Sequence, residues 1–478
     1  MKLKLLLIMF CTFNINLIAE TQIEEVITTG SLLHSPDEDS SPIDIISEEN
    51  LKDLNILTIG EISKYIASSS GSHFQTNSLD GTDQGMSSIT LRGLDHASTL
   101  VLINNKRQTS AGTTSHEGEG YVDINIIPQI ALKQVQILKE GATTAYGSDA
   151  ISGVVNFLTH DDFEGRKLNF DQQKTTNYKQ TDSSLGFLFG KKFDESNIVI
   201  ALDYLDRSPL NASEISGIAE LGLSTLGNSF KVSADDVINS GLYQGSYSEN
   251  QWVADPKCEE NGGVIAGPFC KFLYGERFNI INTEEHAKGY LSYKFNTAAY
   301  QSKTTLIYTD VSVKDNPQSP SYPALSFLSR KIQPGVGGSP FNVPVTWYGR
   351  PLGSAYPSPN SPKDISQYHL SHVMNLYIDE ISDLEVSFSN SKHANKHKRP
   401  DTIDSRFEDA LNGNGGLDGN LTWNIFDISN RNPELIKYIS GFEKSKRVGE
   451  LSVLDAVLHT NIWNMDSAFG LQLSKDKI

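Results

Sequence analysis

The chain has 478 residues, with 40 Lys and Arg against 58 Asp and Glu, so its formal net charge is −18. This acidic balance argues against a nucleic-acid-binding protein, which carries a basic surface. Only three cysteines are present, which excludes a disulfide-dense scaffold. Beyond the N-terminal segment no apolar run reaches about 18 residues, which excludes a bundle of membrane helices.

The first 19 residues have the pattern of a secretory signal peptide. Residues 1–4 carry two lysines, residues 5–18 are mostly apolar, and Ala19 precedes a polar segment. A single membrane anchor is the alternative, but the apolar core is too short for an anchor and contains Asn14 and Asn16. We therefore expect this segment to be removed on export.

Cys258 and Cys270 remain in the exported chain. An even number of cysteines in an exported protein predicts one disulfide, here closing a short Gly-rich loop. Two free thiols are the alternative. A zinc site is not expected, because no His or further Cys lies near enough in the sequence to complete four ligands.

Residues 23–30 form a short β-prone segment, and the polar residues 31–41 that follow are typical of a linker. A strand-forming peptide on a tether is suited to adding a strand to the edge of a partner's sheet. An ordinary first strand is the alternative.

Residues 42–158 predict a compact mixed α/β domain. Ile59, Ile62 and Ile66 have helical spacing, and Asn104-Asn105 is typical of a turn. Two Gly-rich loops are expected at 68–85 and 110–120. The predicted strands are residues 43–46, 88–91, 99–103, 135–138 and 154–158.

From Phe163 onward, segments of about ten residues alternate apolar and polar side chains. In one of them, Ile198, Ile200 and Leu202 share one face, whereas Ala201 and Asp203 share the other. This alternation predicts about nine antiparallel strands between residues 167 and 474, with one face in lipid and the other facing a wet interior. A soluble β-sandwich is the alternative. Aromatic side chains near the strand ends are expected to form an interfacial girdle: Tyr204, Tyr290, Tyr293, Tyr308, Tyr368 and Phe388.

The connections between these strands are uneven. Short joins alternate with very long connections at 206–285 and 311–365, which is the arrangement of an outer-membrane barrel. His393 and His397 are four residues apart, but Lys392, Lys396, Lys398 and Arg399 surround them. This pattern predicts a solvated basic loop there and not a metal site.

Several motifs resemble those of TonB-dependent outer-membrane receptors. Residues 89–94 with 99–104 resemble the first signature of the receptor plug, and residues 23–30 resemble the TonB box. The most specific similarity lies in residues 127–128, 134–142 and 145–157, with several glycines and a Tyr-Gly-Ser-Asp-Ala run in register. The resemblance is close over residues 23 to about 165. In the later residues it is limited to the alternating apolar and polar pattern of the predicted strands.

The resemblance implies a signal peptide at 1–19, a TonB box and linker at 20–41, an α+β plug domain at 42–162, and antiparallel transmembrane β-barrel strands at 163–478. About nine strands cannot close a barrel of roughly 22, which is wide enough to need a plug, so an incomplete barrel is expected. The terminal aromatic residue of the family is not at the end of this chain. We therefore expect a fragment or a truncated reading frame.

The resemblance also implies site residues. The TonB box, which docks a TonB-type energising protein, is Ile23, Glu24, Glu25, Val26, Ile27, Thr28, Thr29 and Gly30. The plug motif comprises Arg92, Gly93, Glu140, Gly141, Tyr146, Gly147, Asp149, Gly153 and Asn156. Arg92, Glu140 and Asp149 either form ion pairs to the barrel wall or cap turns inside the plug. The candidate ligand-binding residues in the two Gly-rich loops are His73, Gln75, His116 and Glu117.

We therefore expect an outer-membrane importer of a scarce solute, such as siderophore-bound iron, cobalamin or a glycan. Its expected partners are the energising protein, a small-molecule or oligosaccharide ligand and outer-membrane lipid, with no cofactor, resident metal or nucleic acid. A ligand sensor or surface-binding module without transport is the alternative. An enzyme is not expected, because the chain has no Gly-x-Ser-x-Gly elbow and His116-Glu117 is not followed by the second His of a zinc protease.

Overall fold

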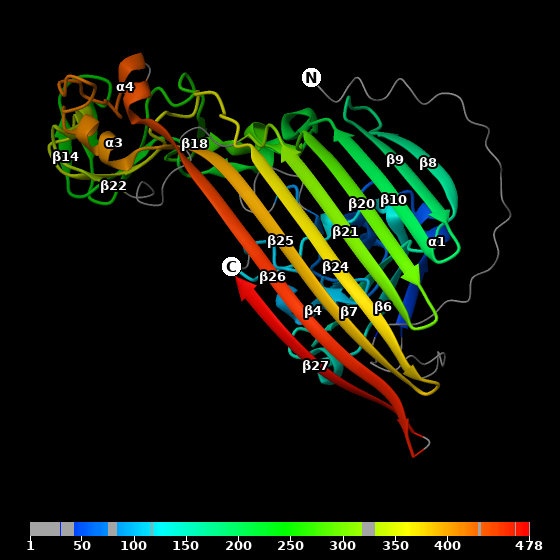
Figure 1. Ribbon diagram of the computed structural model, residues 1–478. Helices are drawn as coiled ribbons and strands as arrows, with labels where there is room; N and C mark the ends of the chain where they lie inside the picture. Colours follow the sequence, from blue (N-terminus) through cyan, green and yellow to red (C-terminus); the bar gives the residue numbers. More distant parts are fainter. Residues whose placement is uncertain are drawn as a thin grey trace.

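The computed structural model describes residues 29, 43–74, 84–115, 118–317, 330–428, 432–463 and 465–477. In these residues, nine long antiparallel strands form one curved sheet, and a smaller five-stranded sheet lies on its concave side (Figure 1). None of the helices in the described part of the chain has the length and hydropathy needed to cross a membrane.

The five-stranded sheet has the order β1-β6-β7-β4-β5, and β4 is parallel to β7. Its strands are β1 (Ile43–Ser47), β6 (Leu132–Leu138), β7 (Gly153–Thr159), β4 (Thr99–Ile103) and β5 (Lys106–Arg107). β4 and β7 are apolar along most of their length because both faces of the sheet are buried. The predicted strands at 43–46, 99–103, 135–138 and 154–158 are confirmed.

Short helices form in the segments between these strands. α1 (Glu48–Asp53) begins at Ser47, which forms a capping box with Asn50. The expected helical turn is the 3-10 helix η2 (Ile59–Lys64), whose Ile59 and Ile62 are fully buried. The remaining helices of the region are α2 (Thr143–Tyr146), η3 (His96–Ser98), η4 (Ile124–Ile126) and η5 (Gln129–Ala131).

The predicted strand at 88–91 is largely wrong. Of the described residues 84–98, only Ser87 and Ser88 form a strand, β3 (Ser87–Ser88), which pairs with β2 (His73–Phe74). The backbone N–H groups of Thr90 and Leu91 instead donate to side-chain hydroxyls, those of Ser72 at 2.7 Å and Thr99 at 3.0 Å. These local hydroxyls take the place of a neighbouring strand.

The nine-stranded sheet confirms the predicted count and the predicted alternation of faces. Leu202 is 56% exposed whereas Ala201 is 0% exposed, and Phe388 is 45% exposed whereas Ser387 is 2% exposed. The sheet runs in the order β27-β26-β25-β24-β21-β20-β10-β9-β8. The bounds are β8 (Gly165–Lys174), β9 (Thr181–Lys192), β10 (Ser196–Arg207), β20 (Glu284–Asn296), β21 (Tyr300–Val313), β24 (Lys363–Asp379), β25 (Ser382–Thr402), β26 (Ser440–Ile462) and β27 (Met465–Lys477).

Two expectations about single residues are wrong. Tyr290 is not in an outward girdle but is 3% exposed on the inner face, because it lies three residues from Tyr293 and a strand puts these two on opposite faces. His393 and His397 are not in a solvated loop but in β25, where pairing with β24 and β26 extends the strand to 21 residues.

The long connections do not form structureless loops. Residues 210–281 and 330–360, together with residues 403–428 and 432–439 of the β25–β26 connection, form a folded unit that we call the apical lobe. Figure 1 shows it beyond one end of β25 and β26. Its core joins all three connections: the rings of Phe230 and Phe426 stack with centroids 4.3 Å apart, and Trp347 lies 5.8 Å from Phe407.

The apical lobe contains short elements. Its strands are β11 (Leu210–Asn211), β12 (Leu223–Ser224), β13 (Ser229–Val232), β14 (Asp236–Ile238), β15 (Gly245–Tyr247), β16 (Trp252–Ala254), β17 (Val264–Ala266), β18 (Phe269–Leu273), β19 (Asn279–Ile281), β22 (Arg330–Ile332) and β23 (Val345–Tyr348). Its helices are η6 (Ala212–Glu214), η7 (Ala219–Leu221), η8 (Tyr274–Arg277), η10 (Val336–Gly338), α3 (Asp404–Leu411) and α4 (Pro433–Ile439).

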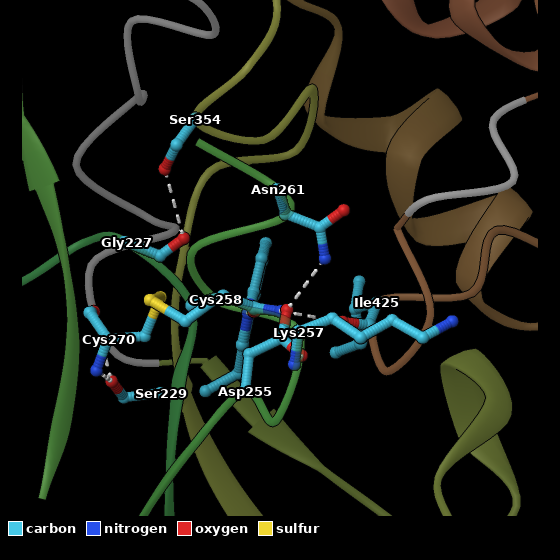
Figure 2. Close-up of a disulfide and its surroundings, with 11 residues drawn as sticks. Gly227, Ser229, Asp255, Lys257, Cys258, Asn261, Cys270, Ser354 and Ile425 are labelled. Atoms are coloured by element: carbon cyan, nitrogen blue, oxygen red, sulfur yellow. Dashed lines mark hydrogen bonds between the residues drawn. A yellow bond between two sulfur atoms is a disulfide. The ribbon is translucent and has the colours of Figure 1, made fainter. Parts of the chain in front are cut away.

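Cys258 and Cys270 form the predicted disulfide inside this lobe, with an S–S distance of 2.03 Å (Figure 2). The N–H of Cys270 donates to the Ser229 hydroxyl at 2.9 Å, which attaches the disulfide to β13. A Cβ atom on Gly263 would lie 2.7 Å from both sulfur atoms, so a glycine is needed where the chain passes the disulfide.

Candidate functional site

Polar groups attach the small domain to the inner face of β25. The Lys106 ammonium donates to Glu385 at 3.0 Å and to the Ser387 hydroxyl at 2.7 Å. Three residues later in the chain, the N–H of Thr109 donates to the Ser391 hydroxyl at 2.8 Å. β25 contributes all three partners, because residues two apart on a strand point to the same face.

The opposite side of the domain is attached to β20 and β21. The Tyr290 hydroxyl donates to the carbonyl of His160 at 2.6 Å and accepts from the Thr159 hydroxyl at 2.9 Å. The Thr309 hydroxyl donates to the carbonyl of Ile126 at 2.6 Å. The apolar core is also shared, since one cluster contains residues of the small domain together with side chains of the curved sheet: Leu188, Val199, Ala201, Tyr290 and Ile307.

Two carboxylates, those of Glu48 and Asp161, form partly buried ion pairs between the small domain and the curved sheet. Burial raises the pKa of the Glu48 carboxyl, but the bonds and charges of His160 and Lys167 outweigh it and lower this pKa to about 2. Burial likewise opposes ionisation of Asp161, but Lys303 at 3.0 Å and Lys294 lower its pKa. Both carboxylates are therefore ionised at neutral pH and hold the domain to strands of the curved sheet.

A third ion-pair group lies on the inner face of β9, β10 and β20. The buried Arg207 guanidinium is 3.2 Å from Asp182 and 3.3 Å from Glu284. It also lies 3.8 Å from Glu61 in the helical turn of the small domain. Arg207 of the curved sheet thus pairs with carboxylates of the sheet itself and of the small domain.

Thr29 is the residue of the expected TonB box that the structure describes, and it is 4% exposed. Its hydroxyl donates to Gln136 at 2.6 Å and accepts from the Asn156 amide at 3.0 Å. Gln136 and Asn156 are directly opposite each other on β6 and β7. They alternate with Val135 and Phe157 of the shared core, so Thr29 is bound on the face of the sheet turned away from the curved wall.

A cluster of rings marks the loops at the other end of the domain. His73 and His96 have centroids 5.0 Å apart, and Tyr121 lies 5.6 Å from His73. The Ser88 hydroxyl lies 3.2 Å from Nδ1 of His73 and 3.1 Å from Nδ1 of His96. The nearby Met86 packs with Tyr121 and with side chains at the upper ends of β21 and β24, which places this ring cluster toward the apical lobe.

Of the two roles expected for Arg92 and Asp149, the described residues show the second, contacts inside the small domain. Arg92 donates to the carbonyls of Ile151 at 2.7 Å and Ser152 at 3.1 Å, inside the small domain. Asp149 pairs with Arg107, also inside it. The bonds to the wall come instead from residues such as Lys106 of β5, which sequence reasoning missed because a lone lysine after a turn gives no signal.

The other motif residues shape turns of the small domain. Gly93 and Gly147 have positive φ values of 68° and 83°, and a Cβ on Gly153 would lie 2.7 Å from the Leu91 side chain. Gly141 follows the exposed Glu140, and the carbonyl of Tyr146 accepts a bond from Arg107. Several predicted site residues lie outside the described residues: Ile23, Glu24, Glu25, Val26, Ile27, Thr28, Gly30, Gln75, His116 and Glu117.

Of the four candidate ligand residues, His73 is therefore the one that the structure locates. Its neighbours His96, Ser88 and Tyr121 were not predicted, because they come from separate segments that only the β2–β3 pairing and the loop packing bring together. Within the described ranges, no group of three or more His, Cys, Asp or Glu side chains is arranged to hold a metal ion.

A family model of the TonB-dependent receptor plug domain matches residues 35–154. An iron-regulated outer membrane virulence protein of Vibrio cholerae is 37% identical over 75 residues, which are 16% of this chain and 12% of that protein. A vitamin B12 transporter of Vibrio vulnificus is 31% identical over 117 residues, 24% of this chain and 17% of that protein. A probable TonB-dependent siderophore receptor of Acinetobacter baumannii is 29% identical over 121 residues, 24% of this chain and 16% of that protein.

Among solved structures, a mutant ferric enterobactin receptor from Pseudomonas aeruginosa is similar with a TM-score of 0.54 at 12% sequence identity. The similarity covers 95% of this chain and 51% of that receptor, so the chain spans about half of its length. At this identity the likeness concerns the fold: a plug domain beside antiparallel barrel strands.

Proposed function

We propose that this chain, which carries a TonB-dependent receptor plug domain and shares the fold of a solved receptor, imports a scarce solute across the outer membrane. The energy is supplied by a TonB-type protein in the periplasm. The solute is siderophore-bound iron, cobalamin or a glycan. Relatives of the plug are named as receptors or transporters for the first two.

The attachment of the plug to the wall is the observation that supports this proposal most. Buried hydrogen bonds join the plug to β20, β21 and β25, and the two share one apolar core. Each such bond contributes roughly 1 kcal/mol, and the lost partner of a buried group costs more. Spontaneous displacement of the plug is therefore rare, and opening a path past it requires work from outside.

The ring cluster formed by His73, His96 and Tyr121 is the proposed solute contact. The half-buried imidazoles of His73 and His96 offer both stacking surfaces and hydrogen-bonding groups, which suits a chelate or a corrin ring better than a simple ion, while the buried Tyr121 ring packs against them. The cluster lies on the side of the plug nearest the apical lobe. Solute bound there shifts the plug toward a state in which Thr29 leaves the plug sheet and the TonB box becomes available to its periplasmic partner.

The energising protein then adds a strand to residues 23–30 and pulls. Thr29 sets the starting point of this step, because its hydroxyl holds the end of the box against Gln136 and Asn156. Release of Thr29 exchanges these two buried bonds for bonds to water and to the partner's strand.

Deletion of residues 23–30 tests the proposal in cells that depend on this chain for uptake. Uptake of a radiolabelled iron chelate or of cobalamin is expected to fall to the level of cells without the chain, while surface binding of the solute persists. Deletion of residues 31–38 removes the same length from the neighbouring linker and is the matched control. Undiminished uptake without residues 23–30 would end the import proposal, and binding without uptake in the unaltered chain would favour a surface-binding role.

A further inference from the structure

The inner face of β24 and β25 presents only polar side chains to the plug over several residues. Odd-numbered residues point inward there, because Ser391 and His393 contact the plug residues Thr109 and Asp123. The two strands pair residue by residue, so their inward side chains form one continuous surface. We call this surface the polar track, and each of its members is at most 4% exposed: Gln367, His369, Ser371, Ser387, Ser389, Ser391, His393 and Asn395.

The inner face of β9, β10, β20 and β21 differs, because it contributes apolar side chains to the core that it shares with the plug. Leu188, Val199 and Ile307 of these strands are 0% exposed in that core. The packing is close, since a Cβ atom on Gly186 of β9 would lie 3.2 Å from the Cβ of the plug residue Ile130. Among the described residues, no member of the shared core comes from β24 or β25. The plug therefore has an apolar side and a polar side.

Several buried atoms on the polar side have no hydrogen-bond partner within the described part of the chain. They are both polar side-chain atoms of Gln367, Nε2 of His369, Nδ1 of His393 and Oδ1 of Asn395 on the wall, and Oε1 of Gln108 on the plug. A buried polar group without a partner costs free energy, so each one needs an explanation. Access of water or of a polar solute to the polar track would remove this cost.

Separating the plug from the wall requires different work on its two sides. On the apolar side, side chains such as Val199 and Ile307 would be exposed to water at a cost proportional to their area. On the polar side, the bond from the Thr109 N–H to Ser391 and the 3.2 Å contact between Gln108 and His369 would be exchanged for bonds to water.

Unpartnered atoms also occur on β10 and β21, at Asn197 and Thr305, but there the apolar core holds the plug as well. The wall at β24 and β25 is therefore the side from which the plug separates with less work.

The upper end of the polar track lies beside the ring cluster. Ile365 is two residues before Gln367 on the same face of β24, and it packs in one buried cluster with Met86 and with Tyr121 of the ring cluster. A solute held by the ring cluster thus has the polar track as its next surface toward the periplasm. The amides, imidazoles and hydroxyls of the track both donate and accept hydrogen bonds, which favours a polar solute.

We propose that the solute passes between the plug and the polar track, while the plug stays bound to β9, β10, β20 and β21 through its apolar side. Gln367, His369 and Ser389 then form hydrogen bonds to the passing solute and its water. The inference rests on the proposed import function, and it adds the route of the solute and the side chains that line this route.

Two pairs of cysteines, one on each side of the plug, test the route in cells that depend on the full chain for uptake. Ile130→Cys with Gly186→Cys locks the apolar side, because their Cβ separation of 3.2 Å is close to the roughly 3.5–4.5 Å of a disulfide. Thr109→Cys with Ser391→Cys locks the polar side. Cys258 and Cys270 are joined to each other, which leaves the added thiols free to pair.

With the apolar side oxidised, uptake of the ferric chelate or cobalamin should equal that of the same variant after mild reduction. With the polar side oxidised, uptake should fall to the level of cells without the chain and return on reduction. Loss of uptake in the oxidised apolar-side variant would overturn the route, as would uptake by the fully oxidised polar-side variant. If both locks stop uptake reversibly, the import proposal stands and the whole plug leaves the wall.

Labelling of single cysteines tests the route without a cross-link. Ser389→Cys lies in the polar track and Ser292→Cys on the inner face of β20, and both serines are buried, at 3% and 0% exposed. During uptake, the reaction of Ser389→Cys with a water-soluble maleimide should become roughly tenfold faster, since a buried thiol reacts only when its site opens. The reaction of Ser292→Cys should not change, and surface binding of the solute checks that both variants are folded.

An equal acceleration at both cysteines, or none at Ser389→Cys, would overturn the route even where uptake still requires residues 23–30. Failure of the import proposal has a different signature, since uptake would then persist after deletion of residues 23–30.

Discussion

Removal of the Thr29 hydroxyl should release the TonB box without any solute. In the structure this hydroxyl is 2.6 Å from Gln136 and 3.0 Å from Asn156, and all three side chains are buried. Thr29→Ala removes the donor to Gln136 and leaves a buried acceptor with one bond fewer. Asn156 is less affected, because its amide also donates to Asn105 at 2.5 Å.

The lost bond sets the size of the effect. A buried polar group that loses its partner costs about 1–3 kcal/mol, which corresponds to roughly a 5- to 150-fold shift toward the released state. The affinity of the energising protein for the solute-free receptor should rise by up to this factor, because the partner no longer has to displace Thr29. The assay is a binding titration of the periplasmic domain of that protein against the receptor in detergent.

Thr29→Ser is the matched control, since it keeps the hydroxyl and removes only a methyl group. It should bind the energising protein like the unaltered chain. If Thr29→Ala and Thr29→Ser have the same affinity in the absence of solute, the Thr29 bonds do not restrain the box and the reasoning is refuted.

Three further variants test the contacts that hold the plug and the lobe. The pKa of Glu48 is lowered to about 2 from 4.5, so its ion pairs stabilise the plug above about pH 4.5 and this stability is lost as the pH falls toward 2. Glu48→Gln should therefore cost about 1–2 kcal/mol of plug stability at pH 7, less than the full pKa shift implies because the side chain is 35% exposed. The variant should also flatten the acid dependence of amide exchange in the plug. Lys106→Met should cost about 1–3 kcal/mol in the same exchange measurement, whereas Lys133→Met, at the exposed pair with Asp162, should cost less than about 1 kcal/mol; equal effects would contradict the buried role of Lys106. Cys258→Ser should cost about 3 kcal/mol of lobe stability and hasten proteolysis of the apical lobe but not of the plug, and uniform cleavage of both would count against an independent lobe.

Local patterns in the sequence predicted the strands well. Alternation along β10 assigned Leu202 outward and Ala201 inward, and the apolar run 99–103 became β4 without a change of bounds. The turn at Asn104-Asn105 also formed, with φ values of 48° and 63° that asparagine tolerates. In each case neighbouring residues within one strand or turn carry the whole signal.

Features that depend on distant contacts were missed. The apical lobe brings Phe230, Trp347 and Phe407 into one core although about 60 or more residues separate each from the next, and no local pattern marks such packing. Tyr290 was placed in a girdle from its position near a strand end, but its face is fixed by register with Tyr293 and by its bond to His160. The histidines of β25 looked solvated because their partners are distant in the sequence: His393 pairs with Asp123 of the plug, and His397 lies 2.6 Å from the Ser361 hydroxyl.

A reversible covalent link between plug and wall tests the central claim most directly. The N–H of Thr109 lies 2.8 Å from the Ser391 hydroxyl, so Thr109→Cys with Ser391→Cys places two thiols at this contact. With the pair oxidised, solute should still bind at the cell surface, but uptake should stop and return after mild reduction, while reduction leaves uptake by the unaltered chain unchanged. Uptake at the unaltered rate by fully cross-linked receptor would contradict the account, because the plug would then not need to leave the wall at β25.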